Sequence, residues 1–284
     1  MRIKNVESLT LQNDFLFCTV FTTNEKLLKE LVEIITGRKV KEIKNLEKQK
    51  FQDFDVTSKA IRLDVSFEDD EGTIYHIEME PTEKWNLFKR MRYYQSNSDA
   101  LQISKGDYYD ELRKTYIIFI CGYDPFDKGL SKYTFRTMCD EVDVEFKDET
   151  VKIVLNTEGY RDNVSKELGN LLDYFSGTVH EDDTFIQELD ETVKQIKNNK
   201  EWRERYMTLE EKFEWYREDG KQIGIKIGEK RGEKRGEKRG LNKGIEETIM
   251  TFVDSRRKDG YTEEEIQKEV QHIFSMDIHN ILNK

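Results

Sequence analysis

The sequence lacks the features that mark membrane-spanning and secreted proteins. No stretch approaches the roughly 18 consecutive apolar residues that a transmembrane helix requires. The N-terminal segment MRIKNVESLTLQNDFLF has neither a continuous apolar core nor a small-residue cleavage site. We therefore expect no membrane span and no secretory signal, and we predict a cytoplasmic protein.

Cysteine is scarce as well, with only Cys18, Cys121 and Cys139 in the chain. The three are widely spaced and form no CxxC pair, which argues against a zinc site or a redox motif. An odd number of scattered cysteines also argues against a disulfide framework. We expect reduced, buried thiols and a reducing compartment.

Apolar residues are few and basic residues do not dominate. The chain of 284 residues is 36% apolar and 37% charged, with a formal net charge of -11. Such a composition predicts that part of the chain is helical and solvated rather than packed in a core. The negative charge argues against a uniformly basic surface, so a nucleic-acid partner would need a local positive region.

The most informative segment that is present is RLDVSFEDDEGTIYHIEME, residues 62–80. Residues 62–67 and 73–79 alternate apolar with polar, which indicates two half-buried strands, and the acidic stretch 68–72 ends in glycine as a hairpin loop does. A slip of one residue would turn every side chain over. If both apolar sets enter one core, the opposite face therefore gathers four polar residues: Asp64, His76, Glu78 and Glu80.

The flanking segments predict the order helix, three strands, helix, strand. Asn13-Asp14 is expected to cap a helix that starts at Phe15, and an amphipathic helix follows at 24–37. Residues 39–47 predict a first strand before the hairpin, and 82–104 predict a helix after it. Two apolar runs, 115–123 and 151–156, predict further strands, so an α/β core occupies residues 1–178.

The C-terminal third has a different character. Residues 179–219 are charged and helical in pattern, glycine recurs at every fourth position through 220–244, and 245–284 predicts short helices. Each interior glycine costs a helix about 1 kcal/mol relative to alanine. The repeat is therefore either a flexible basic tether or a helix whose glycine stripe admits a second helix, and self-association through this tail is one expectation.

Clustered carboxylates have a definite chemistry. Two carboxylates a few ångströms apart do not readily both ionise, so such a site binds a proton or a cation. Hard oxygen ligands select Mg²⁺, Mn²⁺ or Ca²⁺, which activate water and neutralise charge on phosphorus. The alternative is that these acids, and His76 with them, are ordinary residues of a solvated strand face.

Five segments in order resemble the recombination-promoting nuclease / transposase family of the PD-(D/E)XK nuclease superfamily. The similarity spans residues 10–240 and includes NDFLFCTVF, RLDVSFEDDEGTIYHIEME, KRMRYYQS, KGDYYDELRKTYIIFICGYDPF and IVLNTEG. It implies a restriction-endonuclease-like αβββαβ core with a mixed central sheet, followed by a helical C-terminal extension.

The resemblance also implies roles for individual residues. Asp64 and Glu78 match the metal-binding acids, the carbonyl of Met79 commonly completes the shell of the ion, and Mg²⁺ is the expected ion with Mn²⁺ as an alternative. Asp14 matches an acid of the N-terminal block, either near the metal or as a helix cap. Gln95, in KRMRYYQS, is a further secondary candidate.

Two positions depart from the family pattern. Glu80 stands where the superfamily has Lys and this family often has Gln, and Cys18 replaces a Lys. Both changes remove a cation that would stabilise charge in the transition state. Glu80 is expected to act as an added ligand or as a base, and three cations are candidates to compensate: Lys59, Arg62 and Arg90.

DNA contact requires cations near the carboxylates, because phosphate contacts position a duplex without reading its sequence. Six candidates cluster around the motif: Lys59, Arg62, Lys84, Lys89, Arg90 and Arg92. The alternative for Lys89 and Arg92 is the solvated face of a helix.

The sequence thus predicts a Mg²⁺-dependent DNA endonuclease that acts on double-stranded DNA in recombination, mobile elements or phage defence. The main alternative is a degraded, nuclease-like DNA-binding or assembly protein. A carboxylate-pair glycosidase fits the acids but not the family blocks.

Overall fold

The structure is a computed structural model that describes residues 6–52, 61–83 and 86–274, with the side chains of 48–52, 61–63 and 274 left out. The chain divides into two compact units, Met1–Thr208 and Leu209–Lys284. Each unit is described by itself. None of the helices in the described ranges is long and apolar enough to cross a membrane.

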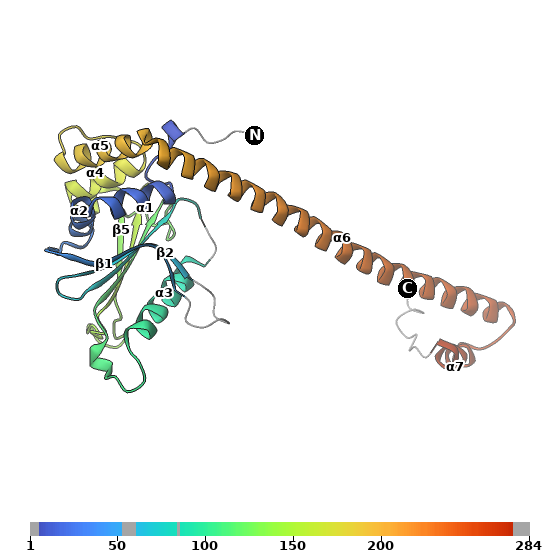
Figure 1. Ribbon diagram of the computed structural model, residues 1–284. Helices are drawn as coiled ribbons and strands as arrows, with labels where there is room; N and C mark the ends of the chain where they lie inside the picture. The colour runs from blue at the N-terminus through green and yellow to red at the C-terminus, as the bar shows by residue number, and fades with distance from the viewer. Residues whose placement is uncertain (1–5, 53–60, 84–85, 275–284) are drawn as a thin grey trace. The chain divides into compact units, whose positions relative to one another are not determined.

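The first unit is built on one mixed sheet (Figure 1). Its strands are β1 (Ile43–Gln52), β2 (Ile61–Asp69), β3 (Ile74–Glu80), β4 (Thr115–Cys121), β5 (Lys132–Phe135) and β6 (Thr150–Asn156), in the spatial order β1-β2-β3-β4-β6-β5. The first three strands are antiparallel, β3, β4 and β6 are parallel, and β5 returns antiparallel to β6. The predicted αβββαβ core with a mixed sheet is confirmed.

Helices cover both faces of the sheet (Figure 1). One face carries α1 (Asp14–Thr23), α2 (Glu25–Thr36), α4 (Lys166–Phe175) and α5 (Thr184–Asn198), and the other carries α3 (Leu87–Gln102). Three single turns of 3-10 helix lie at Val6–Ser8, Tyr109–Glu111 and Arg161–Asn163. Because both faces are covered, every residue of β3 and β4 is buried.

Capping side chains set the boundaries of the first two helices. Asn13 caps α1 by accepting a hydrogen bond from the backbone N–H of Leu16 at 3.0 Å, so the helix begins at Asp14 and not at Phe15. Gly37 ends α2 in the left-handed region, at φ +72°, as the sequence predicts.

The central hairpin has the predicted parity. Val65 pairs with Ile77 and Phe67 with Tyr75, and all four side chains enter the larger core. The turn lies further along the chain than the predicted loop 68–72, because β2 continues to Asp69 and β3 begins at Ile74. The carboxylate of Asp69 closes this turn by accepting from the backbone N–H groups of residues 71 and 73.

Three details differ from expectation. Helix α3 begins at Leu87 rather than at residue 82. Strand β5 was not predicted, because only four residues pair and only one of them is buried. Cys139 is exposed, which corrects the expectation of three buried thiols, whereas Cys18 and Cys121 are buried.

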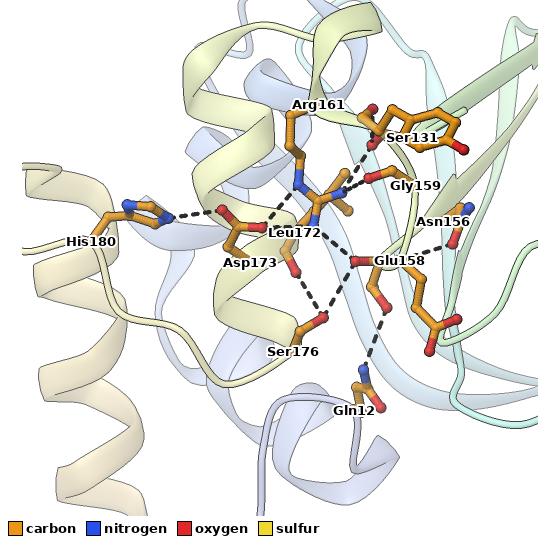
Figure 2. A network of polar contacts seen from close by, with 12 residues as sticks. Gln12, Ser131, Asn156, Glu158, Gly159, Arg161, Leu172, Asp173, Ser176 and His180 are labelled. Atoms are coloured by element: carbon orange, nitrogen blue, oxygen red, sulfur yellow. Dashed lines mark hydrogen bonds and ion pairs between the residues drawn. The ribbon is translucent and has the colours of Figure 1, made fainter. Parts of the chain in front are cut away.

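A polar network centred on Arg161 fastens the connection between β6 and α4 (Figure 2). The guanidinium donates to Asp173 Oδ1 of α4 at 2.7 Å, to Ser131 Oγ at 2.9 Å and to the carbonyls of Thr157 and Gly159 at 2.8 Å. Asp173 also contacts His180 Nε2 at 2.9 Å. The Arg161 side chain therefore ties its own loop to Ser131 and to α4.

We expect Arg161→Ala to destabilise the first unit by about 2–3 kcal/mol, because several charge-assisted hydrogen bonds are lost together. At about 2–4 °C per kcal/mol, the melting temperature should fall by roughly 4–12 °C. Arg136→Ala is the matched control, since Arg136 makes an exposed ion pair with Glu145 at 3.4 Å. Equal melting temperatures for the two variants would contradict this expectation.

The glycine repeat lies within α6 (Lys200–Lys258). The repeat is therefore helical in the structure and is not a flexible tether. In the first unit, the start of α6 packs Trp202 and Tyr206 into the main core. In the second unit, α6 is followed by α7 (Glu263–Phe274), and the two share a small core of Ile249, Val253, Ile266 and Val270. Apart from the neighbouring residues and backbone of α6 itself, no described atom lies within 4 Å of where a Cβ would stand on any repeat glycine.

Candidate active site

Asp64 and Glu78 lie where β2 and β3 stop pairing as a regular ladder. The ladder runs from Glu68↔Ile74 to Val65↔Ile77, and beyond it the strands are joined through side chains. The N–H of Asp64 donates to Glu78 Oε1 at 2.9 Å, and the N–H of Met79 donates to Asp64 Oδ2 at 3.0 Å. The hairpin therefore brings the two carboxylates together, as the sequence parity predicts.

The electrostatics of this pair favour a bound cation. Only 5% of each residue's surface is exposed. Burial raises the pKa of Glu78 well above its ordinary value, and the charge of Asp64 raises it further, against the opposing effects of the Asp64 N–H and of Arg90. Without a cation, Glu78 is therefore driven to hold a proton.

This shift makes a prediction about stability and pH. Folding raises the pKa of Glu78. The contribution of Glu78 to the stability of the fold is therefore fully present below about pH 4.3 and is lost as the pH rises through the pKa of the folded state. We expect Glu78→Gln to raise the melting temperature of the metal-free protein at pH 8 and to have little effect near pH 4. Thermal unfolding across this pH range, with the exposed Glu145→Gln as control, tests it. A melting temperature at pH 8 below that of the wild type would contradict it.

The polar face of the hairpin is buried, which corrects the expectation of a half-exposed face. Helix α3 lies over it and packs Leu87 and Met91 against residues of β4. His76 is accordingly neither on the surface nor solvated. Its Nδ1 lies 3.0 Å from Ser66 Oγ and its Nε2 lies 2.9 Å from Ser98 Oγ, so it links both strands to the helix.

Glu80, the last residue of β3, is 1% exposed and forms an ion pair and hydrogen bond with Arg90 of α3. Arg90 Nη2 also lies 3.7 Å from Glu78 Oε2. Of the cations that could compensate for the missing lysine, Arg90 is the one that the described structure brings to the carboxylates.

The remaining candidate site residues lie in different environments. Cys18 is buried, and its thiol donates to the carbonyl oxygen of Asp64 at 3.3 Å, so α1 supports the backbone of the site. Asp14 lies one turn earlier in α1 and accepts from the N–H of Phe15 at 2.8 Å. Gln95 is a buried residue of α3, and its side-chain amide donates to Asp99 Oδ1 at 2.8 Å.

The candidate DNA-binding residues are only partly described. Lys89 and Arg92 lie on the exposed side of α3. Lys59 and Lys84 fall outside the described residues, and so does the side chain of Arg62. Arg90 differs from all of these, because it points toward the carboxylates.

The donor set fits a hard divalent ion. Within the described ranges, no three His, Cys, Asp or Glu residues group closely enough to form a metal cluster by themselves. Mg²⁺ needs no such cluster, since it commonly binds through one or two carboxylates and keeps several waters. Asp64 and Glu78 supply two carboxylates on facing strands, and Met79, the residue after Glu78, has a carbonyl that could add a third oxygen.

Comparison with known proteins gives one match. A family described as PD-(D/E)XK nuclease family transposase matches residues 11–223, which include every strand and the carboxylate pair. Neither the curated proteins nor the solved structures gave a match.

Proposed function

The chain belongs to the PD-(D/E)XK nuclease family transposases, and from this membership we propose that it is a divalent-metal-dependent DNA endonuclease. Nucleases of this superfamily typically use divalent metals. The observation that carries the proposal is the buried Asp64–Glu78 pair, whose hydrogen bonds cross between two diverging strands.

The proposed roles of the residues combine this geometry with the family resemblance. Asp64 and Glu78 would hold the ion, with Mg²⁺ as first choice and Mn²⁺ as the alternative, and Met79 would offer its carbonyl. A bound ion supplies a water of lowered pKa and offsets charge on phosphorus. Because Glu78 must release its proton before it binds a cation, metal affinity should rise with pH. Hydrolysis then bonds the water oxygen to phosphorus, breaks the P–O bond and leaves a proton on the departing sugar oxygen.

The proposed substrate is double-stranded DNA. Lys89 and Arg92 present exposed cations on α3, and Lys59, Arg62 and Lys84 are further candidates for phosphate contacts. The word transposase in the family description supports a role in recombination or mobile elements; phage defence is the alternative setting.

Cleavage of supercoiled plasmid tests the proposal. We expect nicked and linear DNA in Mg²⁺ or Mn²⁺ and intact plasmid when the ion is chelated. DNA binding without cleavage under any divalent ion would overturn the proposal. It would favour the second candidate function, a DNA-binding or assembly protein, which the ion-paired Glu80 in place of the usual lysine supports.

We further propose that the tail mediates homo-oligomerisation. Four exposed apolar residues follow one another along α6 at spacings of three, seven and four, which fit a coiled-coil seam: Phe213, Tyr216, Ile223 and Ile227. Two identical seams can bury one another, which makes a second copy of the chain the expected partner.

For this reason we expect the particle mass of Ile223→Glu/Ile227→Glu, measured by light scattering, to fall to that of one chain. Ile225→Glu changes an equally exposed isoleucine on another side of the helix and should keep the wild-type mass. A wild-type particle of one chain would contradict self-association.

A further inference from the structure

At the position where this superfamily usually has a lysine, this chain has Glu80, which forms an ion pair with Arg90. Glu80 ends β3, and Arg90 reaches it from the first turn of α3. Arg90 Nη2 also donates to the hydroxyl of Tyr94 at 3.5 Å and lies 3.7 Å from Glu78 Oε2. The guanidinium is thus anchored on one carboxylate and lies beside a proposed metal ligand.

Aromatic rings fix the plane of this guanidinium. Its Cζ lies 5.2 Å from the ring centre of Phe119 on β4 and 5.7 Å from that of Tyr94. Both distances fall within the range of cation–π attraction. The side chain is still 24% exposed, so it is not sealed in the interior.

The contacts leave Arg90 able to bind an anion. A guanidinium has five N–H donors in a rigid fork, and those to Glu80 and Tyr94 account for two. A guanidinium stays protonated in proteins. The group therefore stays cationic beside Glu78, where an attacked phosphate would lie.

Resting on the proposed function, we propose that Arg90 supplies the catalytic cation of the site and that Glu80 is a positioning residue that holds it. In this arrangement the cation would come from α3 rather than from the strand. Arg90 would donate to a non-bridging oxygen of the scissile phosphate and stabilise the negative charge that grows there. Glu80 would act through Arg90 and not as a metal ligand.

The test uses double variants that remove the positive charge of Arg90, or move it to position 80, without leaving the carboxylate of Glu80 unpaired. In Glu80→Gln/Arg90→Gln both charges are gone, and we expect kcat for duplex cleavage in Mg²⁺ to fall about 10²–10³-fold with little change in KM. In Glu80→Lys/Arg90→Gln the cation returns to the strand, and kcat should recover at least about tenfold over the neutral pair.

The matched control is an ion pair at the other end of the same hairpin. Arg113 Nη1 lies 2.7 Å from Glu68 Oε2, so Glu68→Gln/Arg113→Gln removes a similar but more exposed ion pair away from the site. Its kcat should match the wild type. Should the glutamine pair at 80 and 90 fail to fold, Glu80→Leu/Arg90→Met removes the same charges with apolar side chains of similar volume.

Two failures are distinguishable. If the wild type cleaves and both neutral pairs keep kcat within about threefold of it, Arg90 is structural and this inference is overturned while the nuclease stands. If the wild type binds DNA but does not cleave it in the presence of any divalent ion, the proposed function is wrong, and the inference fails with it.

Discussion

Asp64→Asn is expected to lower the rate of DNA cleavage about 10²–10³-fold, the level seen when a group that stabilises transition-state charge is removed. The amide keeps an oxygen that can accept from the N–H of Met79, so the strands should stay joined. It lacks the negative charge that, together with Glu78, would hold a divalent cation. Activity should therefore be lost without loss of the fold.

The measurement is plasmid nicking in Mg²⁺ and in Mn²⁺, together with titration of Mn²⁺ into the metal-free protein. Asp190→Asn is a matched control, because Asp190 accepts from Tyr174 at 3.1 Å on the opposite face of the sheet. Cleavage by Asp64→Asn at a rate near that of the wild type would show that Asp64 is not an active-site residue.

Arg90→Ala is expected to cost about 3–5 kcal/mol of folding stability, the second large effect. Glu80 is 1% exposed and is paired with Arg90, so the substitution leaves a buried carboxylate without its counterion. At about 2–4 °C per kcal/mol, the melting temperature should fall by roughly 6–20 °C.

The neutral pair Glu80→Gln/Arg90→Gln distinguishes the loss of a partner from the loss of packing. It has no buried charge, so its free energy of unfolding in urea should lie well above that of Arg90→Ala. If the free energy of unfolding of Arg90→Ala lies within about 1 kcal/mol of that of the wild type, the ion pair between Glu80 and Arg90 is not the buried interaction described above.

The carboxylate pair was predictable because strand parity is a strict rule. Val65 and Phe67 had to share a face with Tyr75 and Ile77, and Asp64 was then forced to the face of Glu78. Local signals also located the cap at Gly37 and the buried strand of residues 115–121. Each of these features depends on residues close together in the sequence.

Features that depend on tertiary packing were not predictable in the same way. Nothing in the local pattern of β3 shows that α3 covers it, so the burial of His76 was missed. Sequence identified Arg90 as one of three cations that could compensate, and only the placement of α3 brings it to Glu80. Strand β5 was missed because its pairing partner in β6 stabilises it more than its own sequence does.

The helical glycine repeat shows the same limit. Helix propensity opposes a helix at seven glycine positions, yet these positions lie inside α6. The segment is flanked by stretches that do favour helix, including the part of α6 that packs on α7. Propensity summed over the repeat alone therefore left both alternatives open.

Anomalous diffraction from a crystal soaked in Mn²⁺ tests the central claim most directly. We expect one strong peak about 2.0–2.2 Å from carboxylate oxygens of both Asp64 and Glu78. A well-occupied Mn²⁺ site elsewhere, with no peak between these two side chains, would contradict a metal-dependent nuclease centre at the hairpin.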